Sequence, residues 1–372
     1  MAHGSAPIDG STHRSSTGHT PSASPGPRAG PVREPGLGTG TRPTLDEVAR
    51  HAGVGRGTAS RVLNGSMQVS PQARSAVLAS VEALGYVPNR AARSLVTRRT
   101  DTIALVVSET GERLFGEPFF AATVRGISER LSASPYQLLL AMSGSERDRS
   151  RVVAYLTDQH VDGVLLLSLH ADDDLPEQLA ARGVPTVVGG RPPSARLSCV
   201  VDIENEAGGR LAVEHLLRTG RRRVGIIAGP QDMASGRDRL EGALGALERA
   251  GFDRSGVPVA AGDYSERSGE RAMRELLEGN PLDAVFAGSD PMAAGALRVL
   301  HEFGVGVPEE VAVIGFDNAP VGRHTHPELS TVAQPVEEMG RVMAGLLVDR
   351  LAGLEVPELT LLPTHLVVRA ST

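Results

Sequence analysis

Just beyond a polar N-terminal tail, apolar side chains recur at the spacing of three short helices joined by glycine-containing turns. The first helix should begin after Thr44, which can form a capping box with Glu47. The second should cover about residues 56–64, and the third should cover residues 71–84, between a Ser-Pro pair and a glycine. Two short helices across a turn, braced by a third, predict a helix-turn-helix domain over about residues 41–87.

From residue 100 onward the pattern changes to strand-length apolar runs that alternate with helical segments. Near-continuous apolar strands of this kind predict parallel sheets covered by helices on both faces. Eight strands are predicted, and they begin at about residues 103, 136, 163, 184, 197, 224, 283 and 311. A break in the pattern near residue 220 divides them into two lobes. The predicted fold class is therefore α/β, with an N-terminal helix-turn-helix domain and a two-lobed core over residues 100–372.

Residues 1–40 are rich in glycine, serine, proline and threonine and have almost no large apolar side chains. Such a segment cannot bury enough surface to offset the entropy of ordering, so we expect a disordered tail. An additional arm that touches DNA is the alternative, and a solvated tail is the favoured interpretation.

The charge is unevenly spread along the chain. The net charge is −6, yet residues 41–99 hold nine arginines and only three acidic residues. A basic module therefore precedes an acidic body, which favours a nucleic-acid partner for the module. The single cysteine, Cys199, cannot form an internal disulfide and is expected to be an inert core residue. No apolar run is long enough to cross a membrane and no secretion signal is recognisable, so we expect a cytoplasmic protein without a membrane partner.

The second predicted helix presents a polar face that suits DNA. In a helix-turn-helix the start of this helix enters the major groove, which places Arg56 and Gly57 at base edges. The further side chains placed to reach bases or phosphates are Thr58, Ser60, Arg61 and Asn64. Any small three-helix domain has polar residues on its solvent face. Charge, turn spacing and helix order together favour DNA binding over that alternative.

Residues 88–99 are predicted to be a basic hinge helix or linker between the two parts. A helix that begins near Asn89 is shorter than two turns and is marginal on its own in water. It places Leu95 among arginines, which is the arrangement that a minor-groove kinking element needs. The residues alone leave a plain linker equally open.

Three motifs resemble the LacI/GalR family of bacterial transcription repressors: TLDEVARHAGVGRGTASRVLNG, VSPQARSAVLASVEALGYVPNRAARSL and VIGFDN. The resemblance covers residues 42–370 and implies a homodimer that reads a pseudo-palindromic operator in double-stranded DNA. It implies that Leu95 wedges into the central base step with Ala92 beside it, and that Gln68 touches the DNA backbone. The implied DNA-binding positions outside the second helix are Thr44, Gln68, Asn89, Ala92 and Leu95.

The recognition helix departs from the family pattern at two positions. Gly55 stands where a serine is usual, and Gly57 contributes no side chain. Base readout at this end of the helix therefore falls mainly to Arg56, whose guanidinium group pairs best with guanine.

The resemblance also implies a periplasmic-binding-protein-like core with a ligand cleft between its lobes. Lobe 1 should take about residues 100–220 and 335–355, and lobe 2 about residues 221–334 and 356–372. Open parallel sheets bind ligands beyond the carboxyl ends of their strands. By match to sugar-responsive members, the effector-binding positions are Ser108, Arg239, Tyr264, Asp290, Asp317 and Gln334. Carboxylates and a guanidinium group that bind hydroxyls suit a polyol.

Several of these positions have a structural alternative. Asp290 can instead cap the helix that follows it. Arg239 can pair at the surface with Glu241 or Asp238, and Asp317 can be a turn residue. The chain has no tryptophan, so stacking on a sugar must come from another ring. The candidates for that ring are Tyr264, Phe119 and Phe316.

The stretches FGEPFF, VDGVLLLSLHADDDLP and LDAVFAGSDPMAAGALRVL are most similar to actinobacterial repressors of cello-oligosaccharide and β-glucoside use. The implied effector is such a glucoside acting as an inducer, with a purine or another metabolite as the alternative. The C-terminal stretch VVRAST lacks a leucine-heptad extension, which favours a dimer over a tetramer.

The sequence contains no recognisable catalytic constellation. It has no GxGxxG after a strand, no Walker A loop, and neither HExxH nor GxSxG. His324 and His326 lie in a proline-containing loop without a third ligand nearby, so no metal is expected. We expect no cofactor and no enzymatic activity. The alternative is a cytosolic sugar-binding protein or an α/β enzyme that carries an incidental helical N-terminal domain.

Overall fold

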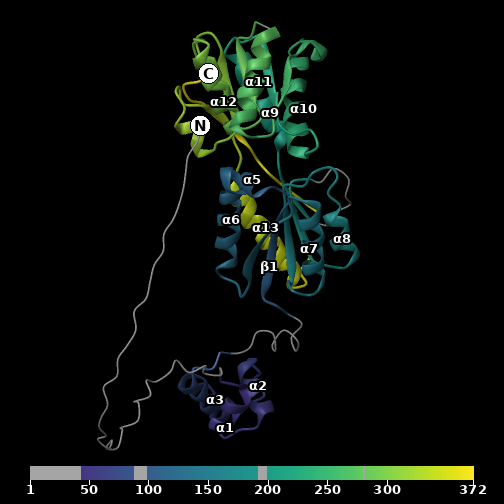
Figure 1. The fold of residues 1–372 in the computed structure, drawn as a ribbon, viewed down its shortest axis with the longest axis vertical. Helices are drawn as coiled ribbons and strands as arrows, with labels where there is room; N and C mark the ends of the chain where they lie inside the picture. The colour runs from purple at the N-terminus through teal and green to yellow at the C-terminus, as the bar shows by residue number, and fades with distance from the viewer. Residues whose placement is uncertain (1–42, 88–98, 192–198, 280) are drawn as a thin grey trace, which may run out of the picture. The chain divides into compact units, whose positions relative to one another are not determined.

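The computed structural model divides the chain into two compact units at Pro88 (Figure 1). The predicted tail and three predicted linker positions, Asn89, Ala92 and Leu95, lie outside the described residues. The structure describes residues 43–87, 99–191, 199–279 and 281–372.

The N-terminal unit is a bundle of three helices, as predicted. Their bounds are α1 Leu45–His51, α2 Arg56–Leu63 and α3 Pro71–Leu84. Thr44 and Glu47 form the capping box: the Glu47 amide donates to Thr44 Oγ1 over 3.3 Å, and Glu47 Oε2 accepts from the Thr44 amide over 2.7 Å. Gly85 ends α3 with φ 60°, a left-handed conformation that glycine adopts without strain. The buried core of the bundle consists of Val48, Ala49, Ala59, Val62 and Val77.

Lobe 1 of the second unit is built on a six-stranded parallel sheet with the strand order β11-β5-β4-β3-β1-β2. Its strands are β1 Thr102–Val107, β2 Gln137–Met142, β3 Gly163–Leu167, β4 Thr186–Gly189, β5 Val200–Ile203 and β11 Leu359–Leu362. Alternate side chains of β1 enter two separate hydrophobic clusters, one with α6 and α13 and the other with α7 and α8. The helices are α5 Gly111–Gly116, α6 Pro118–Leu131, α7 Glu146–Thr157, α8 Leu175–Ala181 and α13 Val336–Leu351. Cys199 is buried in the first of these clusters.

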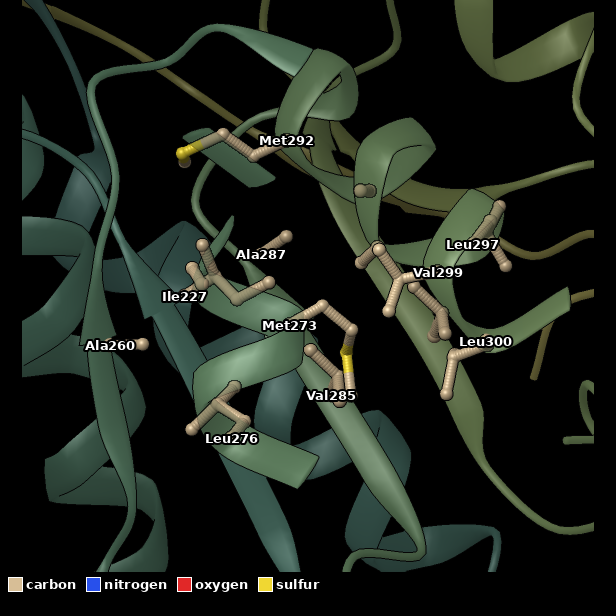
Figure 2. Close-up of a cluster of buried hydrophobic side chains, with 14 of the residues drawn as sticks. Ile227, Ala260, Met273, Leu276, Val285, Ala287, Met292, Leu297, Val299 and Leu300 are labelled. Atoms are coloured by element: carbon tan, nitrogen blue, oxygen red, sulfur yellow. The ribbon is translucent and has the colours of Figure 1, made fainter. Parts of the chain in front are cut away.

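Lobe 2 repeats this layered arrangement with the strand order β12-β10-β9-β8-β6-β7, in which only β12 is antiparallel to its neighbour. Its strands are β6 Val224–Ala228, β7 Val259–Ala261, β8 Ala284–Ala287, β9 Ala312–Asp317, β10 Ser330–Ala333 and β12 His365–Val367. Two helices, α11 Glu266–Gly279 and α12 Asp290–Glu302, enclose the cluster drawn in Figure 2, in which Met273 and Leu276 pack near Ile227 and Val285. The opposite face is covered by α9 Asn205–Arg218 and α10 Ala234–Arg249.

Two elements belong to a different lobe from the one that was expected for them. Helix α9 was expected in lobe 1, which was to run to residue 220, but it packs on α10 and on the lobe 2 sheet. A side chain on Gly209 would meet the Arg239 carbonyl oxygen at 2.1 Å, so the two helix backbones approach closely there. Strand β11 was expected in lobe 2, which was to include residues 356–372, but it pairs with β5 of lobe 1. The chain therefore passes between the lobes after Ile203, near Gln334 and after Leu362.

All eight predicted strands are present, and four further strands were missed: β7, β10, β11 and β12. These strands are three or four residues long, and β10 begins with two polar residues, so none forms a long apolar run. Among the helices described, none is both long enough and apolar enough to span a membrane.

Candidate functional site

A cavity of about 370 Å³ lies between the two lobes, at the carboxyl ends of their parallel strands. Lobe 1 lines it with the segments that follow β3 and β4, and lobe 2 with those that follow β6, β7 and β9. The crossover from Gln334 to Met339 closes the cavity between the lobes. Its volume is in the usual range for small-molecule sites, and its position is where open parallel sheets bind ligands.

Arg239 is the centre of the polar lining, and it is buried although it is charged. Its Nε donates to Asn205 Oδ1 over 2.9 Å, and its Nη1 donates to the Gly288 carbonyl over 2.7 Å and to Asp317 Oδ1 over 3.2 Å. The guanidinium carbon lies 3.8 Å from the ring centroid of Phe316. These contacts fix the orientation of the guanidinium group over the Phe316 ring. The surface alternative for Arg239 is wrong.

Asp317 ends β9 with φ 114°, a conformation that side-chain-bearing residues rarely adopt. This backbone aims its carboxylate into the cavity, where Gln334 Nε2 donates to Oδ1 over 2.5 Å. Burial raises the pKa of Asp317 to about 6, although Arg239 and Gln334 oppose the shift. Both of these donors reach Oδ1, so Oδ2 is the oxygen that can accept hydrogen bonds from a ligand.

Asp290 does not line the cavity, in contrast to the expectation for a ligand contact. It is fully buried behind the site: Oδ1 accepts from Thr331 Oγ1 over 2.6 Å, and Oδ2 accepts from the Ala319 amide over 2.7 Å. The helix-cap alternative is wrong as well, because Ser289 is the N-cap of α12. Burial, followed by the nearby Asp317 carboxylate, raises the pKa of Asp290. Asp290 therefore holds the loop after Asp317 in place.

Ser108 also lies outside the cavity lining. Its hydroxyl donates to Asp173 Oδ2 over 2.5 Å, and Asp173 Oδ1 in turn accepts from the Leu175 amide over 3.1 Å. The side chain is buried among these groups, so it positions the loop that precedes α8.

Aromatic side chains enter the cavity from both lobes. Tyr264 lines it from lobe 2, with its hydroxyl 2.9 Å from Ser235 Oγ, and Phe119 lines it from lobe 1. Phe316 is fully buried beneath Arg239, so it is wrong as a stacking surface.

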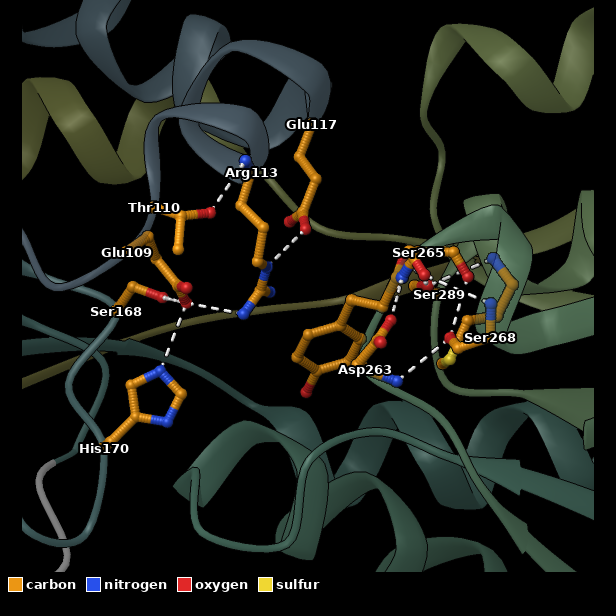
Figure 3. A network of polar contacts seen from close by, with 12 residues as sticks. Glu109, Thr110, Arg113, Glu117, Ser168, His170, Asp263, Ser265, Ser268 and Ser289 are labelled. Carbon is orange, nitrogen blue, oxygen red and sulfur yellow. Dashed lines mark hydrogen bonds and ion pairs between the residues drawn. The ribbon is translucent and has the colours of Figure 1, made fainter. Parts of the chain in front are cut away.

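Several lining residues were not predicted. In lobe 1, Arg113 Nε donates to Glu117 Oε1 over 2.7 Å, and Arg113 Nη1 donates to Glu109 Oε1 over 2.7 Å (Figure 3). Burial raises the pKa of Glu117, although Arg113 opposes the shift. Arg191 and Asn205 also line the cavity. Glu117 could have been found from the sequence, because it lies within the stretch FGEPFF that carries the family resemblance. Arg191 and Asn205 follow strands without a distinctive motif, so the sequence gives no indication of their place in the site.

In the N-terminal unit, α2 presents a polar, accessible face. The Arg56 side chain is 71% exposed and lies 3.5 Å from the Asp46 carboxylate. Arg61 is exposed, and its Nε donates to the Gly57 carbonyl over 3.2 Å. Asn64 and Gln68 are exposed as well. Two predicted contacts, Thr58 and Ser60, are half-buried, and Thr44 holds the capping box of α1.

Comparison with known proteins places this chain in a family. A profile described as "Bacterial regulatory proteins, lacI family" matches residues 44–89, and one described as "Periplasmic binding protein-like domain" matches residues 213–372. The HTH-type transcriptional regulator CelR of Thermobifida fusca is 54% identical over 335 residues, which cover 89% of this chain and 98% of that protein. The chain belongs to the lacI family. Another relative, the ribose operon repressor of Halalkalibacterium halodurans, is 33% identical over 88% of this chain and 97% of its own.

Two solved structures extend the comparison. The transcriptional regulator CelR-cellobiose complex is 51% identical, has a TM-score of 0.71 and covers 89% of this chain and 100% of its own. The lac repressor dimer bound to operator and the anti-inducer ONPF is 29% identical, has a TM-score of 0.79 and covers 89% of this chain and 99% of its own. These findings confirm the predicted family, fold class and function of a DNA-binding transcriptional regulator. These relatives are regulators and not enzymes.

Proposed function

We propose that this protein is a cytoplasmic, homodimeric repressor that leaves its operator when a β-linked glucose oligosaccharide binds between the lobes. The observation that carries the proposal is the preformed polar set of Arg239, Asp317 and Gln334 in a cavity that aromatic rings also line. The CelR relative, which has been solved as a cellobiose complex, supports cellobiose as the first ligand to test.

The proposed binding mode follows from the donor and acceptor types. Asp317 accepts hydrogen bonds from sugar hydroxyls, while Arg239 and Gln334 hold the carboxylate in place and donate to further hydroxyls. Tyr264 and Phe119 offer apolar ring surface to the faces of the sugar rings. The cavity-lining positions among the expected effector contacts are thus Arg239, Tyr264, Asp317 and Gln334. Ser108 and Asp290 act behind this set.

The direct test is fluorescence anisotropy of the full-length protein on an operator selected from a random library, titrated with cellobiose. Ribose is one control, because the relatives include a ribose operon repressor. Hypoxanthine is the other control, because it is a purine, the alternative effector class of the sequence analysis. We expect release by cellobiose and by neither control. Release by ribose or hypoxanthine alone contradicts the glucoside assignment.

On the DNA side, we propose that the exposed guanidinium group of Arg56 reads a guanine in each half of a pseudo-palindromic operator. A bidentate contact to guanine carries roughly 1–3 kcal/mol of discrimination. Arg56→Ala should therefore relax the base preference at one symmetric position in the library selection. A uniform loss over all positions shows that Arg56 contacts a phosphate instead. The remaining proposed contacts are Thr44, Gly57, Thr58, Ser60, Arg61, Asn64, Gln68, Asn89, Ala92 and Leu95.

The enzymatic alternative has its own test. A glycosidase requires two carboxyl groups that flank the scissile bond, whereas each carboxyl group that lines this cavity is paired with an arginine. Asp317 is paired with Arg239, Glu117 with Arg113, and Asp202 with Arg191. Glu337 and Glu338 are both paired with Arg341. We propose that the cavity binds its ligand without turnover. Prolonged incubation with cellobiose, followed by a glucose assay, should detect no product, and steady glucose release overturns this proposal.

A further inference from the structure

One histidine links the two lobes outside the cavity lining. His170 follows β3 in lobe 1, and its Nδ1 lies 2.6 Å from Oδ2 of Asp232, which precedes α10 in lobe 2. Its Nε2 lies 3.3 Å from Glu109 Oε1, which belongs to lobe 1 (Figure 3). The imidazole ring therefore joins a carboxylate of each lobe.

The chemistry of this bridge requires a proton. An ionised carboxylate only accepts hydrogen bonds, and a neutral imidazole ring has a single N–H to donate. Contacts from both ring nitrogens of His170, to Glu109 and to Asp232, thus require the doubly protonated imidazolium. A neutral ring can donate to only one of the two carboxylates, and the lone pair of its other nitrogen then faces the second carboxylate.

The lobe 1 end of the bridge is firmly held. Glu109 is buried, and the same oxygen that faces His170 accepts from Arg113 Nη1 over 2.7 Å and from Ser168 Oγ over 2.6 Å. Arg113 and Ser168 both line the cavity, whereas His170 does not. The bridge is therefore anchored to the wall of the cavity without occupying ligand space.

A second link ends on the same part of lobe 2. Arg191 of lobe 1 donates through Nε to Asp202 over 2.8 Å and pairs through Nη2 with Asp238 of α10. Both links thus reach the stretch 232–238. Arg191 lines the cavity and stays charged at any accessible pH, so His170 is the link that can be removed by pH and without touching the lining.

We propose that His170 is a positioning residue that ties the lobes together through Glu109 and Asp232 and so sets the affinity of the cavity for its ligand. The identity of that ligand, cellobiose, rests on the proposed function. Closed lobes present both walls to a ligand at once, so less of the binding free energy is spent on closure. Loss of the bridge should weaken cellobiose binding by about fivefold, the scale of a partly exposed charged contact.

The titration range of the bridge is set by its partners. The hydrogen bond to Glu109 raises the pKa of His170 to about 9, with burial opposing and Asp232 adding to the shift. The charged groups that face the ring are Glu109, Asp232 and, through Glu109, Arg113. Arg113 stays protonated in the alkaline range, so His170 is the group of this cluster that is expected to change charge near pH 9.

The first experiment needs no ligand. Spin labels at Ala180→Cys in lobe 1 and Ala250→Cys in lobe 2, both exposed positions, report the distance between the lobes in a Cys199→Ala background. The labelled chains are diluted with unlabelled ones, so that a dimer carries the labels on one chain only. We expect a narrow distribution at pH 7 that broadens at pH 10, and a broad distribution at both values in His170→Ala. His170→Gln keeps one donor without a titratable proton, so its distribution should not change between pH 7 and pH 10.

A matched control removes a pair inside one lobe. Arg254→Ala breaks the ion pair with Glu241, both in lobe 2, and should leave the distances unchanged. Distributions for His170→Ala and Asp232→Asn that equal the parent at pH 7 overturn the proposal. In calorimetric titrations at pH 7, cellobiose should bind both variants about fivefold more weakly than the parent, as for a partly exposed charged contact. Parent protein that binds no cellobiose overturns the proposed function, whereas the spin-label result stands independently of it.

Discussion

The two lobes line one cavity with side chains in different states. Lobe 2 presents Arg239, which is buried and bonded to Asn205 and Asp317 before any ligand arrives. Lobe 1 presents two more exposed arginines: the Arg191 side chain is 46% exposed, and that of Arg113, which pairs with Glu117, is 22% exposed, against 7% for Arg239. The contrast indicates that lobe 2 holds a preorganised binding surface and that lobe 1 completes the site as the lobes close.

The largest expected effect is therefore in lobe 2. Asp317→Ala leaves the buried Arg239 without its charged partner and removes the acceptor for ligand hydroxyls. Truncation of one member of such a pair costs about 2–5 kcal/mol of binding free energy. The variant should still bind operator with the affinity of the parent but should no longer be released by cellobiose.

Anisotropy titrations with and without cellobiose measure this effect. Glu241→Ala, which removes an exposed carboxylate of α10 that does not line the cavity, is the matched control and should behave as the parent does. Release of Asp317→Ala at the parental cellobiose concentration shows that Asp317 is a turn residue, and the contrast between the lobes then fails.

The next largest effect is a pH dependence of cellobiose affinity, which arises from Asp317 in lobe 2. Burial raises the pKa of Asp317 to about 6, and the ionised form accepts the ligand hydroxyls. Cellobiose affinity should therefore fall by up to about tenfold for each pH unit below this pKa. The stability of the unliganded protein should depend on pH with the opposite sign. Because the pKa of Asp317 is higher in the folded protein than in the unfolded chain, its contribution to the free energy of unfolding is fully present below the pKa of the unfolded chain and is lost as pH rises through about 6.

Calorimetric titrations between pH 5 and pH 8 test this dependence. In Asp317→Asn the acidic limb should disappear, because the amide does not titrate. Persistence of the limb in that variant assigns it to another carboxyl group, with Glu117 of lobe 1 as the first candidate.

The smallest effect is expected in lobe 1. Glu117→Gln keeps an oxygen that can accept from Arg113, and Arg113 retains its second partner, Glu109. The loss of cellobiose affinity should stay below about 1 kcal/mol, the usual scale of a partly exposed ion pair. A loss as large as that of Asp317→Ala, measured by the same titration, shows that lobe 1 is preorganised as well.

What could be predicted from the sequence is mainly local. The capping box of Thr44 and Glu47 and the left-handed Gly85 are set by neighbouring residues, so the three N-terminal helices followed directly. Asp317 could be placed because its strand is a clear apolar run that ends in a carboxylate.

The rest depends on contacts between distant parts of the chain. Asp290 is similar in sequence context to a helix cap, and only the approach of Thr331 and the Ala319 amide shows that it is a buried support. Helix α9 has an ordinary amphipathic pattern, and its place in lobe 2 depends on the close approach at Gly209. The contact of His170 with Asp232 joins residues 62 positions apart, and no local pattern predicts it.

The route of the chain through lobe 1 bears on the order in which the protein folds during synthesis. The lobe 1 core needs Met339, Met343 and Leu347 of α13, and its sheet needs the edge strand β11. Both elements leave the ribosome after nearly all of lobe 2, so the first strands of lobe 1 remain partly uncovered while lobe 2 is being made. Lobe 2 can form much of its own core in that interval, whereas lobe 1, although it begins first, can complete its core only after α13 has been made.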